Sequence, residues 1–106
     1  MSKTILITGG SRGIGRATAV LFAAKGWNVA ISFVGNRQSA DETCALCEQA
    51  GVAGNALAYQ CDVRDEASVV GFFAATRDRF SSIDGVVKHA GIVAPQARLQ
   101  TWISNA

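Results

Sequence analysis

The sequence predicts an α/β fold in which a doubly wound parallel β-sheet carries helices on both faces. Short runs of β-branched and apolar residues alternate along the chain with longer segments of helical periodicity, and this alternation is typical of parallel sheets. The first apolar run leads directly into a cluster of glycines, at the position where such sheets bind their ligands. One domain is expected over residues 1–106.

Four stretches are expected to form strands, because each is short, rich in apolar residues and bounded by turn residues. They are residues 3–8, 27–33, 55–61 and 83–87. Short connections and right-handed crossovers predict the strand order 3-2-1-4. Beyond residue 92 the pattern fades into a loop at 94–96 and a possible helix start at 97–106. The expected architecture is a Rossmann-like sheet that is truncated, with the domain incomplete after about residue 92.

Three segments between the strands are expected to be helices. They span residues 14–25, 39–50 and 65–80. In the first, apolar side chains recur at helical spacing at Ile14, Ala17, Val20, Leu21 and Ala24. Gly26 and Gly51 are placed to end the first two helices. The third has Asp65 and Glu66 in its first turn, where they favour the helix dipole. Its buried face is expected at or near Val69, Phe72, Phe73 and Phe80.

Composition and charge limit the kinds of molecule expected to bind this chain. Hydrophobic residues make up 49% of the chain and charged residues 17%, which is typical of a globular protein. The net charge is +2 with Lys and Arg scattered, so neither a nucleic acid nor a membrane surface is expected as partner. No apolar stretch approaches the ~20 residues of a membrane span, and the first apolar run is too short for a signal peptide. We expect a cytoplasmic protein whose partner is a small molecule.

The cysteines agree with a reducing compartment, because three are present and an odd number does not suit a disulfide scaffold. Cys44 and Cys47 have C-x-x-C spacing but fall within a predicted helix and lack a second ligand pair. A buried structural role is therefore expected for them, and no metal site.

The glycine-rich segment at residues 8–15 reads T-G-G-S-R-G-I-G and joins the first strand to the first helix. Glycine is needed where the chain turns sharply and where the backbone must approach a phosphate closely. The helix N-terminus adds free N–H groups and a positive dipole end for an anion. The spacing of Gly9, Gly13 and Gly15 differs from G-x-G-x-x-G, so its position between strand and helix carries the prediction of phosphate binding.

Three motifs carry a resemblance to a known family. They are the octapeptide at 8–15, Cys61-Asp62-Val63 at the end of the third strand, and Ala90-Gly91-Ile92 after the fourth. Together they resemble the short-chain dehydrogenase/reductase family, from the first strand to about Ile92. The resemblance implies a nicotinamide cofactor and an oxidoreductase that reduces a carbonyl or oxidises an alcohol.

The resemblance also implies roles for individual residues. Asp62 would accept a hydrogen bond from the adenine amino group, the Val63 backbone would meet the ring, and Ala90 and Gly91 would pass beside the ribose. The residues that would line the phosphates are Gly9, Ser11, Arg12, Gly13, Ile14 and Gly15. From the sequence, Asp62 remains open to a second interpretation, as a strand-end or helix-capping carboxylate.

NADP is expected in preference to NAD. An NAD site usually has an acid ~20 residues past the glycines, where it bonds the ribose hydroxyls. Here residues 33–37 contain none, and the first acid is Asp41. Arg37 and Arg12 could instead pair with a 2′-phosphate, although Arg37 could equally be a solvated loop residue.

Two departures from the family pattern concern catalysis. Lys88 and His89 stand where the family has Asn-Asn before Ala-Gly, and a structural or cofactor-edge role is expected for His89. The resemblance implies a catalytic Ser and a Tyr-x-x-x-Lys motif, but Tyr59 is the sole tyrosine and Val63 follows it at the lysine position. No catalytic residue is therefore assigned in this chain.

The sequence leaves two functions open. The chain is the cofactor-binding portion of an NADP-dependent oxidoreductase, or it is a truncated, non-catalytic nucleotide-binding or interaction module. A different Rossmann enzyme, such as a methyltransferase, fits the Asp62-Val63 and Ala90-Gly91 placements less well. The outer edge of the fourth strand would be open, which predicts a chain that is marginally stable or self-associates.

Overall fold

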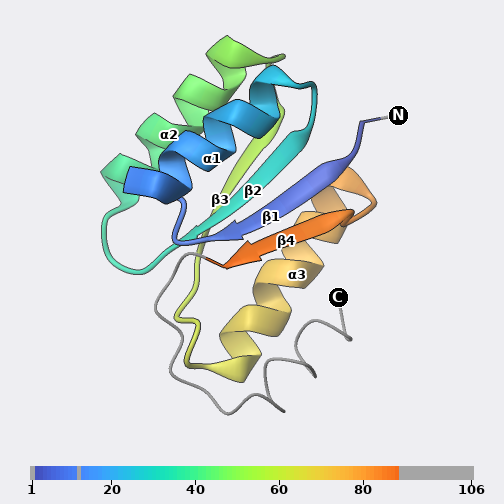
Figure 1. The fold of residues 1–106 in the computed structure, drawn as a ribbon. Helices are drawn as coiled ribbons and strands as arrows, with labels where there is room; N and C mark the ends of the chain where they lie inside the picture. Colours follow the sequence, from blue (N-terminus) through green and yellow to red (C-terminus); the bar gives the residue numbers. More distant parts are fainter. Residues whose placement is uncertain (1, 12, 89–106) are drawn as a thin grey trace.

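A computed structural model describes residues 2–11 and 13–88, and its elements confirm the expected alternation (Figure 1). The strands are β1 (Thr4–Thr8), β2 (Asn28–Phe33), β3 (Ala56–Gln60) and β4 (Gly85–Lys88). The helices are α1 (Gly13–Ala24), α2 (Arg37–Ala50) and α3 (Glu66–Phe80). All strand pairs are parallel and the sheet order is β3-β2-β1-β4, as the sequence predicts. The expected loop at 94–96 and helix start at 97–106 lie outside the described residues.

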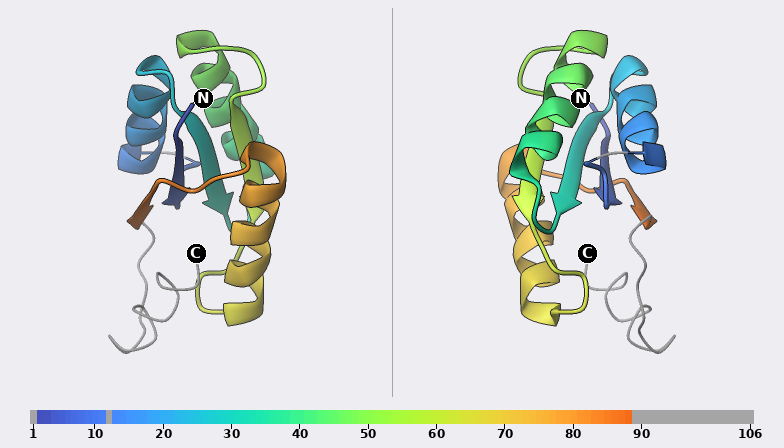
Figure 2. Two further views of the ribbon diagram at one scale, coloured as in Figure 1. Left: turned by 90° about the vertical axis from the view of Figure 1, so that its right-hand side faces the viewer. Right: turned by 90° about the vertical axis from the view of Figure 1, so that its left-hand side faces the viewer.

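The helices form a layer on each side of the sheet, and Figure 2 shows α1 and α3 on opposite sides of it. Alternate side chains of each strand point to opposite layers, as the pleat requires. Those facing α1 and α2 include Ile5, Ile7, Val29, Ile31 and Phe33. Leu6 and Ala30 face α3, where Val69, Phe72 and Phe73 complete a second core as expected. Burial on both faces explains why β1 and β2 are almost continuously apolar.

Helix α1 presents an unexpected face to the sheet. The apolar pattern predicts the helix correctly, but Ile14 and Leu21 are 74% and 56% exposed. The buried residues are Gly15, Ala19 and Ala23, spaced one helical turn apart. Their small side chains let the helix backbone lie close to the strands, so large apolar residues are excluded from this face.

The ends of the other two helices are fixed by caps. The Asn36 side chain accepts a hydrogen bond from the Ser39 N–H at 3.0 Å, so α2 begins at Arg37 rather than at the expected Ser39. Asp65 is the N-cap of α3 rather than a residue of its first turn, and it accepts from the Ala67 N–H at 3.1 Å. Gly51 follows α2 as expected, and its N–H donates to the Cys47 carbonyl.

The three cysteines are free thiols, and Cys47 and Cys61 are buried. Burial raises the pKa of Cys44 and of Cys47 to about 11. Within residues 2–11 and 13–88, no helix combines the length and apolar character needed to cross a bilayer.

Candidate functional site

The site lies where the four parallel strands end. Because these strands run in one direction, their carboxyl ends meet at one edge of the sheet (Figure 1). Three connections begin there: the glycine loop after β1, residues 34–36 after β2, and residues 61–65 after β3. Parallel α/β sheets bind their ligands at this edge.

The glycine loop has a backbone that other residues would disturb. Gly9 and Gly13 have φ values of 74° and 63°, in the left-handed region where glycine is strongly favoured. A Cβ at Gly15 would collide with the Gly9 carbonyl oxygen and lie 2.9 Å from the Gly10 Cα. The start of α1 is therefore packed directly against the loop, with backbone rather than side chains at the contact.

Ser32 holds the loop to the sheet. Its hydroxyl accepts a hydrogen bond from the Gly9 N–H at 3.0 Å, and its carbonyl accepts from the Gly10 N–H at 3.2 Å. Ser32 was not among the residues predicted from the sequence, although a buried polar residue in an otherwise apolar strand is a recognisable signal. Two loop amides are thus used to anchor the turn.

Arg16 and Thr43 hold the loop to α2. The Arg16 guanidinium donates to the Ser11 carbonyl at 2.7 Å and to the Ser39 carbonyl at 2.9 Å. Thr43 is fully buried, and its hydroxyl lies 3.0 Å from the same Ser11 oxygen. Neither residue was predicted from the sequence, because their partners are far apart along the chain.

Arg37 begins α2 beside the glycine loop. Its guanidinium lies 5.4 Å from the centre of the Phe33 ring and 3.5 Å from an Asp41 carboxylate oxygen. Both charged side chains are exposed, at 66% and 60%. An exposed cation at a helix N-terminus is an arrangement that can bind an anion.

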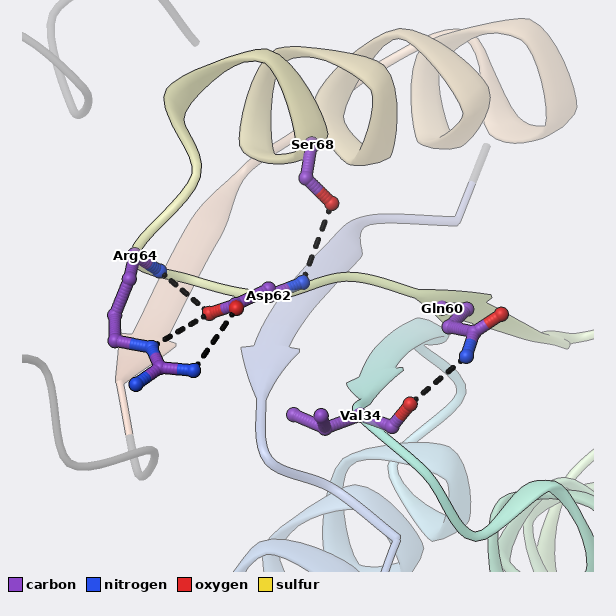
Figure 3. A network of polar contacts seen from close by, with 5 residues as sticks. All are labelled: Val34, Gln60, Asp62, Arg64 and Ser68. Carbon is purple, nitrogen blue, oxygen red and sulfur yellow. Dashed lines mark hydrogen bonds and ion pairs between the residues drawn. The ribbon is translucent and has the colours of Figure 1, made fainter.

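Asp62 follows β3 and is bound by Arg64 (Figure 3). The Arg64 backbone N–H and Nε donate to Oδ1 at 3.0 and 3.1 Å, and Nη2 donates to Oδ2 at 3.1 Å. The Arg64 hydrogen bonds lower the pKa of the Asp62 carboxyl group below its usual value. Asp62 does not cap α3, since Asp65 does so.

Neighbouring contacts fix the segment that carries Asp62. The Asp62 N–H donates to the Ser68 hydroxyl at 3.2 Å, and Gln60 Nε2 donates to the Val34 carbonyl at 2.9 Å (Figure 3). Val63 is half-buried and packs against the core under α3. The ends of β2 and β3 are thereby tied together beside the Asp62 carboxylate.

The last part of the site is β4. Lys88 pairs in register with Thr8, and burial lowers the pKa of its ammonium group.

Tyr59 stacks on Phe72 at 5.7 Å in the core beneath α3. Of the expected site residues, Arg12, Ala90 and Gly91 lie outside the described residues, as does His89.

The comparison with protein families identifies the family of this chain. A family model described as short chain dehydrogenase matches residues 3–104. The chain belongs to the short-chain dehydrogenase family. The resemblance stated from the sequence is confirmed, and with it the Rossmann-like fold and membership of a family of oxidoreductases that use nicotinamide cofactors.

Relatives of this short-chain dehydrogenase chain are found in curated proteins and solved structures. The uncharacterized oxidoreductase YgfF of Escherichia coli strain K12 is 42% identical over 95 residues, covering 90% of this chain and 38% of that protein. A crystal structure of levodione reductase is 37% identical with a TM-score of 0.74, over 79% of this chain and 32% of that one.

A crystal structure of xylitol dehydrogenase is 33% identical with a TM-score of 0.72, over 79% of this chain and 31% of that one, and it holds NAD⁺. The chain thus spans less than half the length of each of these relatives. An NAD⁺ complex among them means that family membership alone does not decide between NAD and NADP.

Proposed function

We propose that this chain binds NADP(H) as the cofactor-binding portion of an oxidoreductase that reduces a carbonyl or oxidises an alcohol. The observation that carries the proposal is the close packing of the glycine loop on the start of α1, where a Cβ at Gly15 would collide with the Gly9 carbonyl oxygen. Gly9 and Gly13 have left-handed backbone conformations in this turn, and α1 begins at Gly13. That combination of glycine turn and helix dipole suits the pyrophosphate of a dinucleotide.

The preference for NADP rests on charge at the start of α2. Arg37 supplies an exposed guanidinium there, and no carboxylate stands at residues 33–36 to bond a ribose 2′-hydroxyl. Asp41, the first acid, is paired with Arg37. A 2′-phosphate would compete with Asp41 for this guanidinium, with Arg12 as the second proposed ligand.

Asp62 and Val63 are proposed to bind the adenine, with Ala90 and Gly91 beside the ribose. Of the Asp62 oxygens, Oδ1 accepts two hydrogen bonds from Arg64, whereas Oδ2 accepts one. A carboxylate oxygen has two lone pairs, so Oδ2 retains an acceptor position for the adenine amino group. The low pKa of Asp62 keeps it ionised and able to accept that bond near neutral pH.

When bound, the nicotinamide supplies the hydride chemistry, while this chain's residues hold and orient the dinucleotide. We assign no proton-transfer residue here, because Tyr59 is packed on Phe72 in the core. The acid that acts on the carbonyl oxygen is proposed to come from a longer form of the protein.

The free thiols support a reducing compartment, and we propose the cytoplasm. The nucleotide class is tested by chromatography of the purified chain on immobilised adenosine 2′,5′-bisphosphate and on an immobilised S-adenosyl ligand. Retention on the first alone, with elution by NADPH, is the expected result. Retention on the S-adenosyl ligand alone would contradict the proposal.

A further inference from the structure

Arg16 stands one residue after the glycine-rich segment at residues 8–15, and its side chain joins three segments of the chain. Nε donates to the Thr43 hydroxyl at 2.9 Å, while Nη2 donates to the carbonyls of Ser11 and Ser39 at 2.7 and 2.9 Å. We propose that Arg16 and Thr43 are positioning residues that hold the glycine loop and the first turn of α2 in the arrangement that binds one dinucleotide. The proposal rests on the proposed NADP(H) function.

Thr43 closes the cluster from the side of α2. It is fully buried, and its hydroxyl lies 3.0 Å from the Ser11 carbonyl oxygen and 3.2 Å from that of Ser39. The side chains of Arg16 and Thr43 therefore both donate to the same two carbonyls, one in the glycine loop and one in the first turn of α2. We call these four residues, Ser11, Arg16, Ser39 and Thr43, the loop clamp.

The loop clamp controls the direction of a carbonyl group. A carbonyl oxygen carries partial negative charge, and one turned toward the phosphates would repel them. Two donors hold the Ser11 oxygen toward α2, and one of them is a charged guanidinium, whose hydrogen bonds are stronger than neutral ones. Only arginine offers several fixed donors in one plane, so lysine cannot reproduce this set of contacts.

The clamp also joins the two anion sites of the proposed cofactor. The glycine loop would hold the pyrophosphate, and the first turn of α2, with Arg37 at its start, would hold the 2′-phosphate. These groups are covalently linked in the dinucleotide at a limited range of separations. Holding the two protein segments together before binding reduces the ordering cost that the ligand must otherwise meet.

The test compares Arg16→Met and Thr43→Val with Thr43→Ser as the matched control, since serine keeps the hydroxyl. Thr43→Val serves should Arg16→Met fail to fold. Dissociation constants are measured for NADPH and for 2′-AMP, which carries the 2′-phosphate without the pyrophosphate. Amide hydrogen exchange is followed at Gly9, Gly10, Ser39 and Ala40.

Both disrupting variants are expected to weaken NADPH about tenfold, as the loss of hydrogen bonds to a charged group would cause, with 2′-AMP changed less than about twofold. Exchange is expected to quicken in the loop and the first turn of α2 but not in α3, and Thr43→Ser is expected to match the wild type. Unchanged NADPH affinity in folded variants, or equal weakening of both ligands, would overturn the proposal.

A wild-type chain that binds no NADPH would contradict the proposed function. Hydrogen exchange would then test separately whether the loop clamp holds the glycine loop and the first turn of α2. Faster exchange confined to the loop and the first turn of α2 in Arg16→Met and Thr43→Val would support it. Exchange identical in all variants would refute it.

Discussion

Arg37 is the described residue on which the proposed preference for NADP most depends. Replacing Arg37 by Gln should weaken NADPH about fivefold while leaving NADH unchanged, since an exposed charge pair contributes roughly 1 kcal/mol or less. Asp41→Asn should strengthen NADPH about twofold, because it removes a competing carboxylate from Arg37. Calorimetric titration of both cofactors measures these changes.

Arg77→Gln is the control for Arg37. It removes the same charge from the last turn of α3, which lies at the opposite edge of the sheet from the glycine loop. If Arg37→Gln and Arg77→Gln weaken NADPH equally, the effect is one of net charge, and the assignment of Arg37 fails.

The C-x-x-C pair should be chemically inert in the folded chain. Burial raises the pKa of Cys44 and Cys47 to about 11, so little thiolate is present at pH 8. Iodoacetamide should label them slowly until urea is added, as mass spectrometry would show. Rapid labelling of Cys47 in the folded protein would contradict the buried structural role.

The raised pKa values of Cys44 and Cys47 should make the free energy of unfolding depend on pH. Their pKa values in the folded state lie above the ordinary thiol value of 9.0, so the unfolded chain loses these protons first as pH rises. Their contribution to stability is intact below about pH 9 and is lost progressively toward pH 11. The urea midpoint should fall across that range, and cysteine-to-alanine substitution should reduce the fall.

Among the elements, α3 depends on its N-cap. Asp65→Ala should lower the free energy of unfolding by about 1 kcal/mol, since the Ala67 N–H loses its acceptor. Asp65→Asn keeps an acceptor oxygen and should cost much less, as urea unfolding would measure. Equal losses in both variants would mean that charge, rather than the cap hydrogen bond, stabilises this end.

The elements also show what the sequence can predict. The strands could be predicted because burial on both faces makes β1 and β2 almost continuously apolar. The strand order then followed from the alternation of strands and helices and from the short connections between them. The buried face of α1 did not follow, since close packing there selects Gly15, Ala19 and Ala23 rather than large apolar residues. The contacts of Arg16 with Ser39 and Thr43 were equally hidden, because folding alone brings these residues together.

At the scale of the whole molecule, β4 forms one edge of the described sheet. Among residues 2–11 and 13–88 it pairs with β1 alone, and its residues are only half-buried. We expect a chain that self-associates or is marginally stable, which sedimentation velocity and urea unfolding would reveal. A dilute monomer that unfolds cooperatively with a stability of ~5–15 kcal/mol would contradict this expectation.

Calorimetric titration of the purified chain with NADPH, alongside Gly15→Ala and Gly26→Ala, tests the central claim most directly. A Cβ at Gly15 would collide with loop backbone, whereas one at Gly26, beyond the far end of α1, meets no heavy atom within 4 Å. Gly26 has a φ of 89°, so alanine there strains the backbone away from the site and controls for a general loss of stability. We predict binding by the wild type and by Gly26→Ala, and a loss of more than about tenfold in Gly15→Ala, because the loop that approaches the phosphates must shift to admit the Cβ. Equal NADPH affinity in all three proteins would show that the glycine loop is not the cofactor site.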